Sequence, residues 1–236
     1  MRQIMNKEKR IITPRLVIML LLAVVIIPML PLLVSRQWNW TEAWIYAAIC
    51  ILGFVISRVL AARRNPGLLA ERAQFGRQTD AKSWDRTMTS LLTLGGLIIH
   101  LVPGLDRLKG WSGGFGTTWV VAGFVLVVAG YFLGSYALVA NRYFSGMVRI
   151  QNDRDHKVVS SGPYRWVRHP GYLGAVITYA GIPFLLDSVW TLIPVVITIG
   201  ILVIRTSLED RTLQNELDGY KEYIRHTRYR LFPGVW

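Results

Sequence analysis

Six long apolar segments divide this chain, and they constrain its fold more than any other feature of the sequence. They cover residues 16–34, 42–61, 88–104, 118–140, 171–186 and 189–204. Segments of this composition are typical of helices that cross a lipid bilayer, and the mean hydropathy of the whole chain is +0.35. We therefore expect an all-α fold, a polytopic helical membrane protein with about five to six transmembrane helices.

Two of the segments need separate comment. The segment 16–34 lacks the small-residue cleavage pattern of a signal peptide, so we expect it to be a retained anchor. Only Asp187 and Ser188 separate the last two segments, and each of these is short for a full span at about 1.5 Å per residue. We expect them to form a tight hairpin of tilted helices.

Basic residues are distributed very unevenly between the two sides of these segments. Of the 27 lysines and arginines, the loops on one side contain only Arg36, Arg107 and Lys109. This asymmetry follows the positive-inside rule, which predicts that both termini and the long loops face the cytosol. The net charge of +13 is therefore assigned to topology and anionic headgroups, and not to nucleic acid. A bacterial inner membrane and an endoplasmic reticulum both fit this pattern.

Two shorter helices are expected on the cytosolic side. Asn65-Pro66-Gly67 is a turn signal, and the apolar residues that follow it among charges predict a short interfacial helix. After Arg205, apolar residues recur at helical spacing and predict one amphipathic helix. They are Leu213, Leu217, Tyr220 and Ile224.

A polar and aromatic stretch, residues 161–174, lies between two strongly apolar segments. It reads Ser-Gly-Pro-Tyr-Arg-Trp-Val-Arg-His-Pro-Gly-Tyr-Leu-Gly. Polar groups close to lipid are costly to desolvate and tend to mark function. Pro170 disfavours helical geometry at His169, so we expect a helix to begin at Pro170. The first N–H groups of that helix would be free to bind an anionic group.

Arg205, Glu209 and Asp210 form a second polar group, where the last apolar segment ends. Arg205 and Glu209 are spaced i,i+4 and share a helix face. They could form a simple ion pair with Asp210 as a solvated neighbour, which would contribute little energy. They could also face the loop at 141–172, which carries two histidines. The spacing alone does not separate these interpretations.

The inventory of reactive side chains narrows the possible chemistry. The chain has one cysteine, Cys50, and neither a Ser-His-Asp arrangement nor an HExxH motif. Hydrolase and metalloenzyme interpretations therefore have little support, and we expect no metal site. Donors, acceptors and aromatic faces without a strong nucleophile fit an enzyme whose chemistry is carried by a bound cofactor.

Residues 162–174, followed by Arg205-Thr206-Ser207-Leu208-Glu209-Asp210, resemble the C-terminal half of the isoprenylcysteine carboxyl methyltransferase family. Phospholipid N-methyltransferases share the broader pattern, and the resemblance runs from about Asn141 to Trp236. It implies a single integral membrane domain over residues 1–236, with transmembrane helices in 1–140 and the cofactor-binding and catalytic region in 141–236. It also implies S-adenosylmethionine as the cofactor, held in a cytosolic pocket without a Rossmann domain.

The resemblance assigns roles to particular residues. Arg205 and Glu209 would be catalytic, and Arg205 would also bind and orient the methyl acceptor. Asp210 stands where the family usually has a second Glu; it keeps the charge with a shorter reach, which leaves its role open. The residues expected to contact the cofactor are Gln151, His156, Lys157, Val158, Val159, Tyr164, His169, Pro170, Gly171, Tyr172 and Glu209.

The acceptor is expected to be a lipophilic small molecule or a lipidated group that enters sideways between helices from the membrane. A carboxylate acceptor needs only a cation such as Arg205 to position it. An amine acceptor would have to lose a proton, and Glu209 or His169 could then assist. The sequence leaves the choice among carboxylate, amine and thiol open.

Two other functions compete with methyl transfer. Membrane sterol reductases that use NADPH have a related RHPxYxGE pattern, but here Ala175 stands in place of the Glu. A non-catalytic transporter or scaffold is the third possibility. The apolar segments lack the midplane charges that would line a transport pathway, which argues against it.

Overall fold

The computed structural model describes residue 18 and residues 21–76 and 78–236 of the chain. The first part of the predicted segment 16–34, and the basic residues that precede it, lie outside these described residues. The described residues form helices and contain no strand. The helices are η1 (Leu22–Ile26), α3 (Ile27–Ser35), α4 (Thr41–Arg64), α5 (Pro66–Ala73), α6 (Ser83–Lys109), α7 (Thr117–Ala140), η2 (Asn152–Arg154), η3 (Gly162–Arg165), α8 (Pro170–Leu185), α9 (Leu192–Glu216) and α10 (Tyr220–His226).

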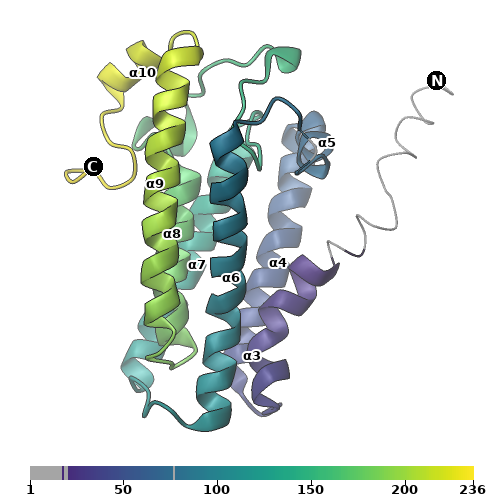
Figure 1. The fold of residues 1–236 in the computed structure, drawn as a ribbon, viewed down its shortest axis with the longest axis vertical. Coiled ribbons are helices and arrows are strands. Elements are labelled where there is room, and N and C mark those ends of the chain that lie inside the picture. The colour runs from purple at the N-terminus through teal and green to yellow at the C-terminus, as the bar shows by residue number, and fades with distance from the viewer. Residues whose placement is uncertain (1–17, 19–20, 77) are drawn as a thin grey trace, which may run out of the picture.

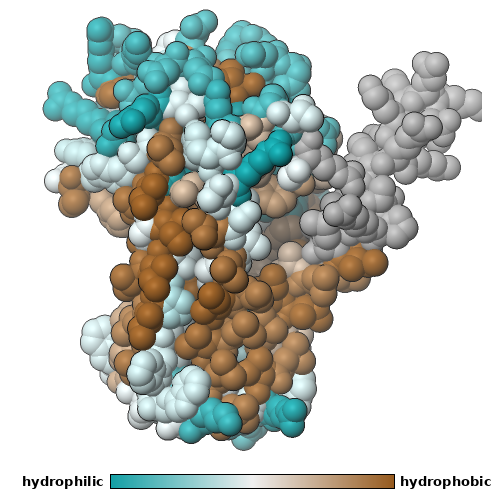
Figure 2. Space-filling view, viewed as in Figure 1, coloured by the Kyte–Doolittle hydropathy of each residue, from teal (hydrophilic) through white to brown (hydrophobic). Residues whose placement is uncertain are grey.

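The long helices run side by side in one bundle, and α5, α10 and the long loops gather at one end of it (Figure 1). Four helices, α4, α6, α7 and α9, are long and apolar enough to cross a membrane, and α8 is a shorter apolar helix. Figure 2 shows apolar residues over the middle of the visible face, with polar residues at both ends. A surface that is apolar around its waist is unfavourable in water and suits lipid. The chain is therefore an integral membrane protein, as the sequence predicts.

The last helix of the bundle is longer than its apolar segment. α9 has 25 residues and extends past Arg205 because Thr206, Asp210 and Thr212 are buried against the polar end of the molecule. Burial and not hydropathy therefore determines where this helix ends. A short connection, residues 186–191, joins α8 to α9, with Asp187 in the left-handed region at φ 50°. The predicted hairpin is therefore present, but α9 is not a short helix.

The prediction of a single amphipathic helix after Arg205 is wrong. α9 ends at Glu216, Gly219 has φ 78°, and α10 is a separate short helix. The break lets Leu217, Tyr220 and Tyr223 turn back into one buried cluster, which also packs against Val158 of the preceding loop. The apolar periodicity was real, but it continues across a chain reversal that the pattern alone does not reveal. The short interfacial helix predicted after Asn65 is confirmed as α5.

Glycines allow α7 and α8 to approach each other closely. A β-carbon at Gly130 of α7 would lie 2.6 Å from the carbonyl oxygen of Gly174 and 2.5 Å from the backbone nitrogen of Thr178, both on α8. Small residues at such contacts are the usual way in which membrane helices pack without a hydrophobic driving force. This packing fixes α8, and with it the segment at its start.

We expect Gly130→Ala to destabilise the bundle, because backbone atoms on the facing helix cannot move aside for the new methyl group. The cost of such overpacking is about 1–3 kcal/mol. Gly134→Ala, one turn along the same helix with nothing within 4 Å of its β-carbon, is the matched control and should be neutral or slightly stabilising. Unfolding midpoints of both variants in the same detergent test this. Equal midpoints would contradict the packing account.

Candidate active site

A pocket lies at the end of the bundle where α8 begins and α9 leaves its apolar stretch, under the loop that joins α7 to α8. It encloses about 850 Å³ of empty space, part of which is open to solvent. Ligand sites in proteins are commonly of this size. Eleven predicted residues lie on its wall, and Pro170 alone does not. They are Gln151, His156, Lys157, Val158, Val159, Tyr164, His169, Gly171, Tyr172, Arg205 and Glu209.

The helix start predicted at Pro170 is confirmed, and it shapes one side of the pocket. His169 is the residue before α8, at φ −124° and ψ 61°, and Pro170 is the first residue of the helix. The N–H groups of Tyr172 and Leu173 both donate to the carbonyl oxygen of His169. These donors are therefore occupied, and the prediction that the first N–H groups are free to bind an anion is wrong for these two residues. The tail fixes the preceding backbone, because Arg168 and His169 donate to the carbonyls of Tyr229 and Arg230.

Asp210 is not a solvated neighbour of the predicted pair; it is fully buried at the centre of a polar cluster. Arg168 donates to it through Nε and Nη2 at 2.8 and 3.1 Å, and Arg230 donates through Nε at 2.8 Å. The hydroxyl of Tyr220 donates at 2.9 Å, and Nε2 of His169 lies 3.2 Å away. Asp210 therefore connects the His169-Pro170 turn to α9, α10 and the tail. Since the pocket wall does not include it, its role is to hold this turn in place.

Arg205 and Glu209 do not pair with each other. Arg205 forms a buried bidentate pair with Asp85 at the start of α6, with Nε 2.7 Å from Oδ1 and Nη2 3.1 Å from Oδ2. Glu209 instead accepts a short hydrogen bond from the hydroxyl of Tyr172. The interpretation as a simple i,i+4 ion pair is therefore wrong. A cation and a carboxylate, each with its own partner, lie on the same pocket wall.

Tyr172 lies between the charged groups of the pocket. Its ring stacks on that of His169, with centroids 5.8 Å apart and planes 12° apart. The guanidinium carbon of Arg205 lies 5.4 Å from the centre of the same ring. A guanidinium over an aromatic face is attracted by the ring quadrupole. Tyr172 thus fixes the relative positions of Arg205, His169 and Glu209.

The loop between α7 and α8 closes the other side of the pocket through contacts within itself. Gln151 is 1% exposed; its side chain donates to the Tyr143 carbonyl at 2.6 Å and accepts from Arg154 at 2.6 Å. The hydroxyl of Tyr164 accepts a hydrogen bond from Asn141 at 3.2 Å. Lys157 points into solvent, where it pairs with Asp155. Of these predicted cofactor contacts, Gln151 is therefore chiefly a support of the loop.

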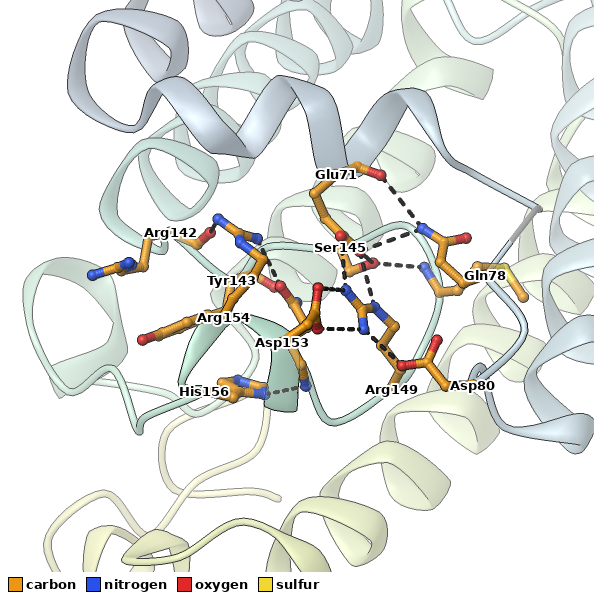
Figure 3. A network of polar contacts seen from close by, with 12 residues as sticks. Glu71, Gln78, Asp80, Arg142, Tyr143, Ser145, Arg149, Asp153, Arg154 and His156 are labelled. Carbon is orange, nitrogen blue, oxygen red and sulfur yellow. Dashed lines mark hydrogen bonds and ion pairs between the residues drawn. The ribbon is translucent and has the colours of Figure 1, made fainter. Parts of the chain in front are cut away.

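Arg149 connects this loop to α5 and to the segment that follows α5 (Figure 3). Its local sequence does not distinguish it from the other basic residues of the loop. Nη2 of Arg149 lies 2.8 Å from Glu71 of α5, and Nη1 lies 2.7 Å from Asp80 and 2.9 Å from Asp153. The hydrogen bond from Ser145 to Glu71 joins the same network at 3.1 Å. Burial opposes ionisation of Glu71, but hydrogen bonds from Arg149 outweigh it and lower the pKa of Glu71.

His156 is held as a neutral ring. Burial lowers its pKa to about 4, and the charges of Arg149 and Arg154 act in the same direction. The ring packs 4.5 Å from that of Tyr143, and its Nδ1 accepts the N–H of Gln151 at 3.3 Å. A neutral ring at this position adds no positive charge to the pocket.

Because the folded pKa of His156 is below its ordinary value of 6.5, the unfolded chain binds more protons between these two values. The stabilising contribution of the neutral ring is therefore fully present above pH 6.5 and is lost as the pH falls toward 4. We expect the NMR signals of this ring to remain those of neutral imidazole from about pH 8 to about pH 5.5. A titration midpoint at the ordinary value would contradict the burial of this ring.

Comparison with known proteins gives consistent matches. Residues 121–215 match the family model described as the isoprenylcysteine carboxyl methyltransferase (ICMT) family. The chain is 31% identical over 153 residues to a probable protein-S-isoprenylcysteine O-methyltransferase of Oryza sativa subsp. indica, covering 59% of this chain and 68% of the relative. It is 40% identical over 55 residues to the protein-S-isoprenylcysteine O-methyltransferase of Saccharomyces cerevisiae, covering 23% of each chain. The matched residues 121–215 run from α7 to α9 and contain most of the pocket wall, but not Asp85 or Glu71.

Proposed function

The chain belongs to the isoprenylcysteine carboxyl methyltransferase family, and on this basis we propose that its pocket transfers a methyl group from S-adenosylmethionine to the carboxylate of an isoprenylated cysteine. The protein is a membrane methyltransferase, and its family implies a methyl donor. Neither the reductase nor the non-catalytic alternative is favoured by any relative named above. The identity of the donor, the acceptor and the residues that bind them is our proposal.

The observation that carries the proposal is the arrangement of Arg205 and Glu209 on one pocket wall. Glu209 accepts a hydrogen bond from a tyrosine and has no basic partner among the described residues. A carboxylate in such a place favours a cationic ligand. Arg205 carries the opposite charge one helical turn away. The pocket therefore suits a positively charged donor beside a negatively charged acceptor.

The side chains of the pocket support S-adenosylmethionine as the donor. The empty space of about 850 Å³, part of which is open to solvent, is in the usual range for ligand sites. Tyr164 and Tyr172 supply aromatic surface, and Glu209 supplies the anion for a sulfonium or amino group. When bound, S-adenosylmethionine supplies an already activated methyl group, and the electron pair of the broken carbon–sulfur bond stays on sulfur.

The residues of the pocket mainly have to align the two ligands and keep water out. Alignment alone can supply about 7–11 kcal/mol of a reaction barrier. Arg205 positions the acceptor carboxylate, which needs no general base because it carries no proton at neutral pH. The Asp210 cluster holds His169 and the start of α8 as a rigid wall behind both ligands. An isoprenyl chain would lie along the apolar helices next to the pocket, which gives a reason for the enzyme to be in a membrane. On the positive-inside rule, we place the pocket on the cytosolic side.

Transfer of labelled methyl groups by the purified protein tests this function. With methyl-labelled S-adenosylmethionine, we expect label to appear in an N-acetyl-S-farnesylcysteine as a base-labile ester. N-acetylcysteine without the isoprenyl chain and the preformed methyl ester of the farnesylated compound should remain unlabelled. Label that is stable to base, or label on the preformed ester, would contradict a carboxylate acceptor.

A further inference from the structure

Asp85 is a buried acid at the start of α6, outside the matched residues 121–215, and nothing in its local sequence marks it. It is 0% exposed. Its two oxygens accept Nε and Nη2 of Arg205, and Oδ2 also accepts the N–H of Val148 at 2.7 Å. The backbone N–H of Lys82 donates to the carbonyl oxygen of Val148 at 3.0 Å. Asp85 therefore ties Arg205 to both α6 and the loop over the pocket.

These contacts determine which part of the Arg205 guanidinium is left for a ligand. A guanidinium has five N–H bonds, and it binds a carboxylate with two of them along one edge. The edge formed by Nε and Nη2 is taken by Asp85. The second N–H of Nη2 donates to the carbonyl of Gly146 at 3.0 Å, which blocks the edge formed by Nη1 and Nη2. None of the described residues accepts from Nη1.

We infer that Asp85 is a positioning residue, which makes Arg205 hold the methyl acceptor through Nη1 alone. This inference rests on the function proposed above. A guanidinium with an open edge would bind both oxygens of a carboxylate, and each oxygen would then be a weaker nucleophile because it accepts an N–H bond. With only Nη1 available, one oxygen is held and the other is left to react.

The consequence for the reaction is direct. The free oxygen of the acceptor forms the new bond to the methyl carbon while the bond from that carbon to sulfur breaks. The electron pair of the broken bond stays on sulfur, and no proton moves. Because Asp85 already pairs with Arg205, the guanidinium holds the acceptor less strongly than an unpaired cation would. Binding energy that is equal in the ground state and the transition state would not increase kcat.

Kinetics of Asp85→Asn in the full-length protein test this inference. Asn keeps the shape of the side chain but removes the charge and one acceptor, which frees the edge of Arg205. We expect kcat for N-acetyl-S-farnesylcysteine to fall by about 10- to 100-fold, while its KM stays the same or falls. The Kd of S-adenosylhomocysteine should stay within about twofold of wild type, because Asp85 does not line the pocket.

Asp106→Asn is the matched control. Asp106 is also buried on α6, at the opposite end of the helix, where it accepts hydrogen bonds from Ser112 and Ser188. This variant should lower stability without changing kcat or KM. If Asp85→Asn does not bind S-adenosylhomocysteine, Asp85→Ser replaces it, since its short side chain also leaves this edge of Arg205 open; kcat should again fall without a rise in KM.

Three outcomes would overturn the inference. Unchanged kcat and KM in the Asp85 variants would show that the edge of Arg205 does not matter. A raised KM with unchanged kcat would show that Asp85 merely supports binding. Wild-type protein that binds S-adenosylhomocysteine but methylates no isoprenylated cysteine would overturn the proposed function, and this inference with it.

Discussion

Glu209→Gln is expected to abolish tight binding of S-adenosylhomocysteine and, with it, methyl transfer. Among the described residues Glu209 is the one acid on the pocket wall, and it accepts the Tyr172 hydroxyl. The amide keeps the size and part of this hydrogen bond but loses the charge that we expect to face the ammonium group of S-adenosylhomocysteine. Losing one partner of a buried charged contact costs about 2–5 kcal/mol, which corresponds to at least about a 30-fold weaker Kd.

Glu216→Gln is the matched control for this variant. Glu216 lies on the same helix but on the surface, where it pairs with Lys82 at 2.6 Å. A surface pair of this kind contributes little to stability, so binding and transfer should be unchanged. Calorimetric titration of both variants with S-adenosylhomocysteine decides the matter. Wild-type affinity in Glu209→Gln would remove Glu209 from the binding site.

Asp210→Asn is expected to cause the largest loss of stability of any single charge removal in the described part of the chain. Asp210 accepts hydrogen bonds from Arg168, Arg230 and Tyr220 and has no solvent exposure. Asn lacks the charge and one acceptor, so the buried guanidinium of Arg168 and the partly exposed guanidinium of Arg230 lose their counterion. Breaking a buried ion pair in this way costs about 3–5 kcal/mol.

Denaturant unfolding in a fixed detergent measures this loss. Asp218→Asn, an exposed position just beyond α9, should remain within about 0.5 kcal/mol of wild type. We also expect Asp210→Asn to weaken binding of S-adenosylhomocysteine even where it is folded, because His169 is then no longer held. If Asp210→Asn is as stable as Asp218→Asn, the cluster does not organise the pocket.

The sequence predicted the membrane helices well because the property that selects them acts locally. Bilayer thickness and backbone satisfaction require long apolar helices, and each such segment is visible by itself. The start of α8 is also predictable from local sequence, since Pro170 determines the backbone geometry of His169. The end of α9 does not follow from local sequence, because the helix contains the buried Asp210, whose partner Arg168 is distant in the sequence.

The partners of the charged residues could not be predicted either, because they are distant in the sequence. The spacing of Arg205 and Glu209 on one helix allows an ion pair between them, yet the partner of Arg205 is Asp85 in the other half of the chain. Arg149 is buried against Glu71, which is also distant from it in the sequence. The division into membrane helices before residue 140 and a catalytic region after it therefore leaves out two acids that shape the pocket. Only the arrangement of the helices in the bundle brings Asp85 and Glu71 close to the residues of the pocket.

The most direct test of our account is calorimetric binding of S-adenosylhomocysteine to the purified wild-type protein, with NADPH as the competing ligand. We predict that S-adenosylhomocysteine binds and that NADPH neither binds nor displaces it. Binding of NADPH without binding of S-adenosylhomocysteine would contradict the proposal that this pocket holds the methyl donor.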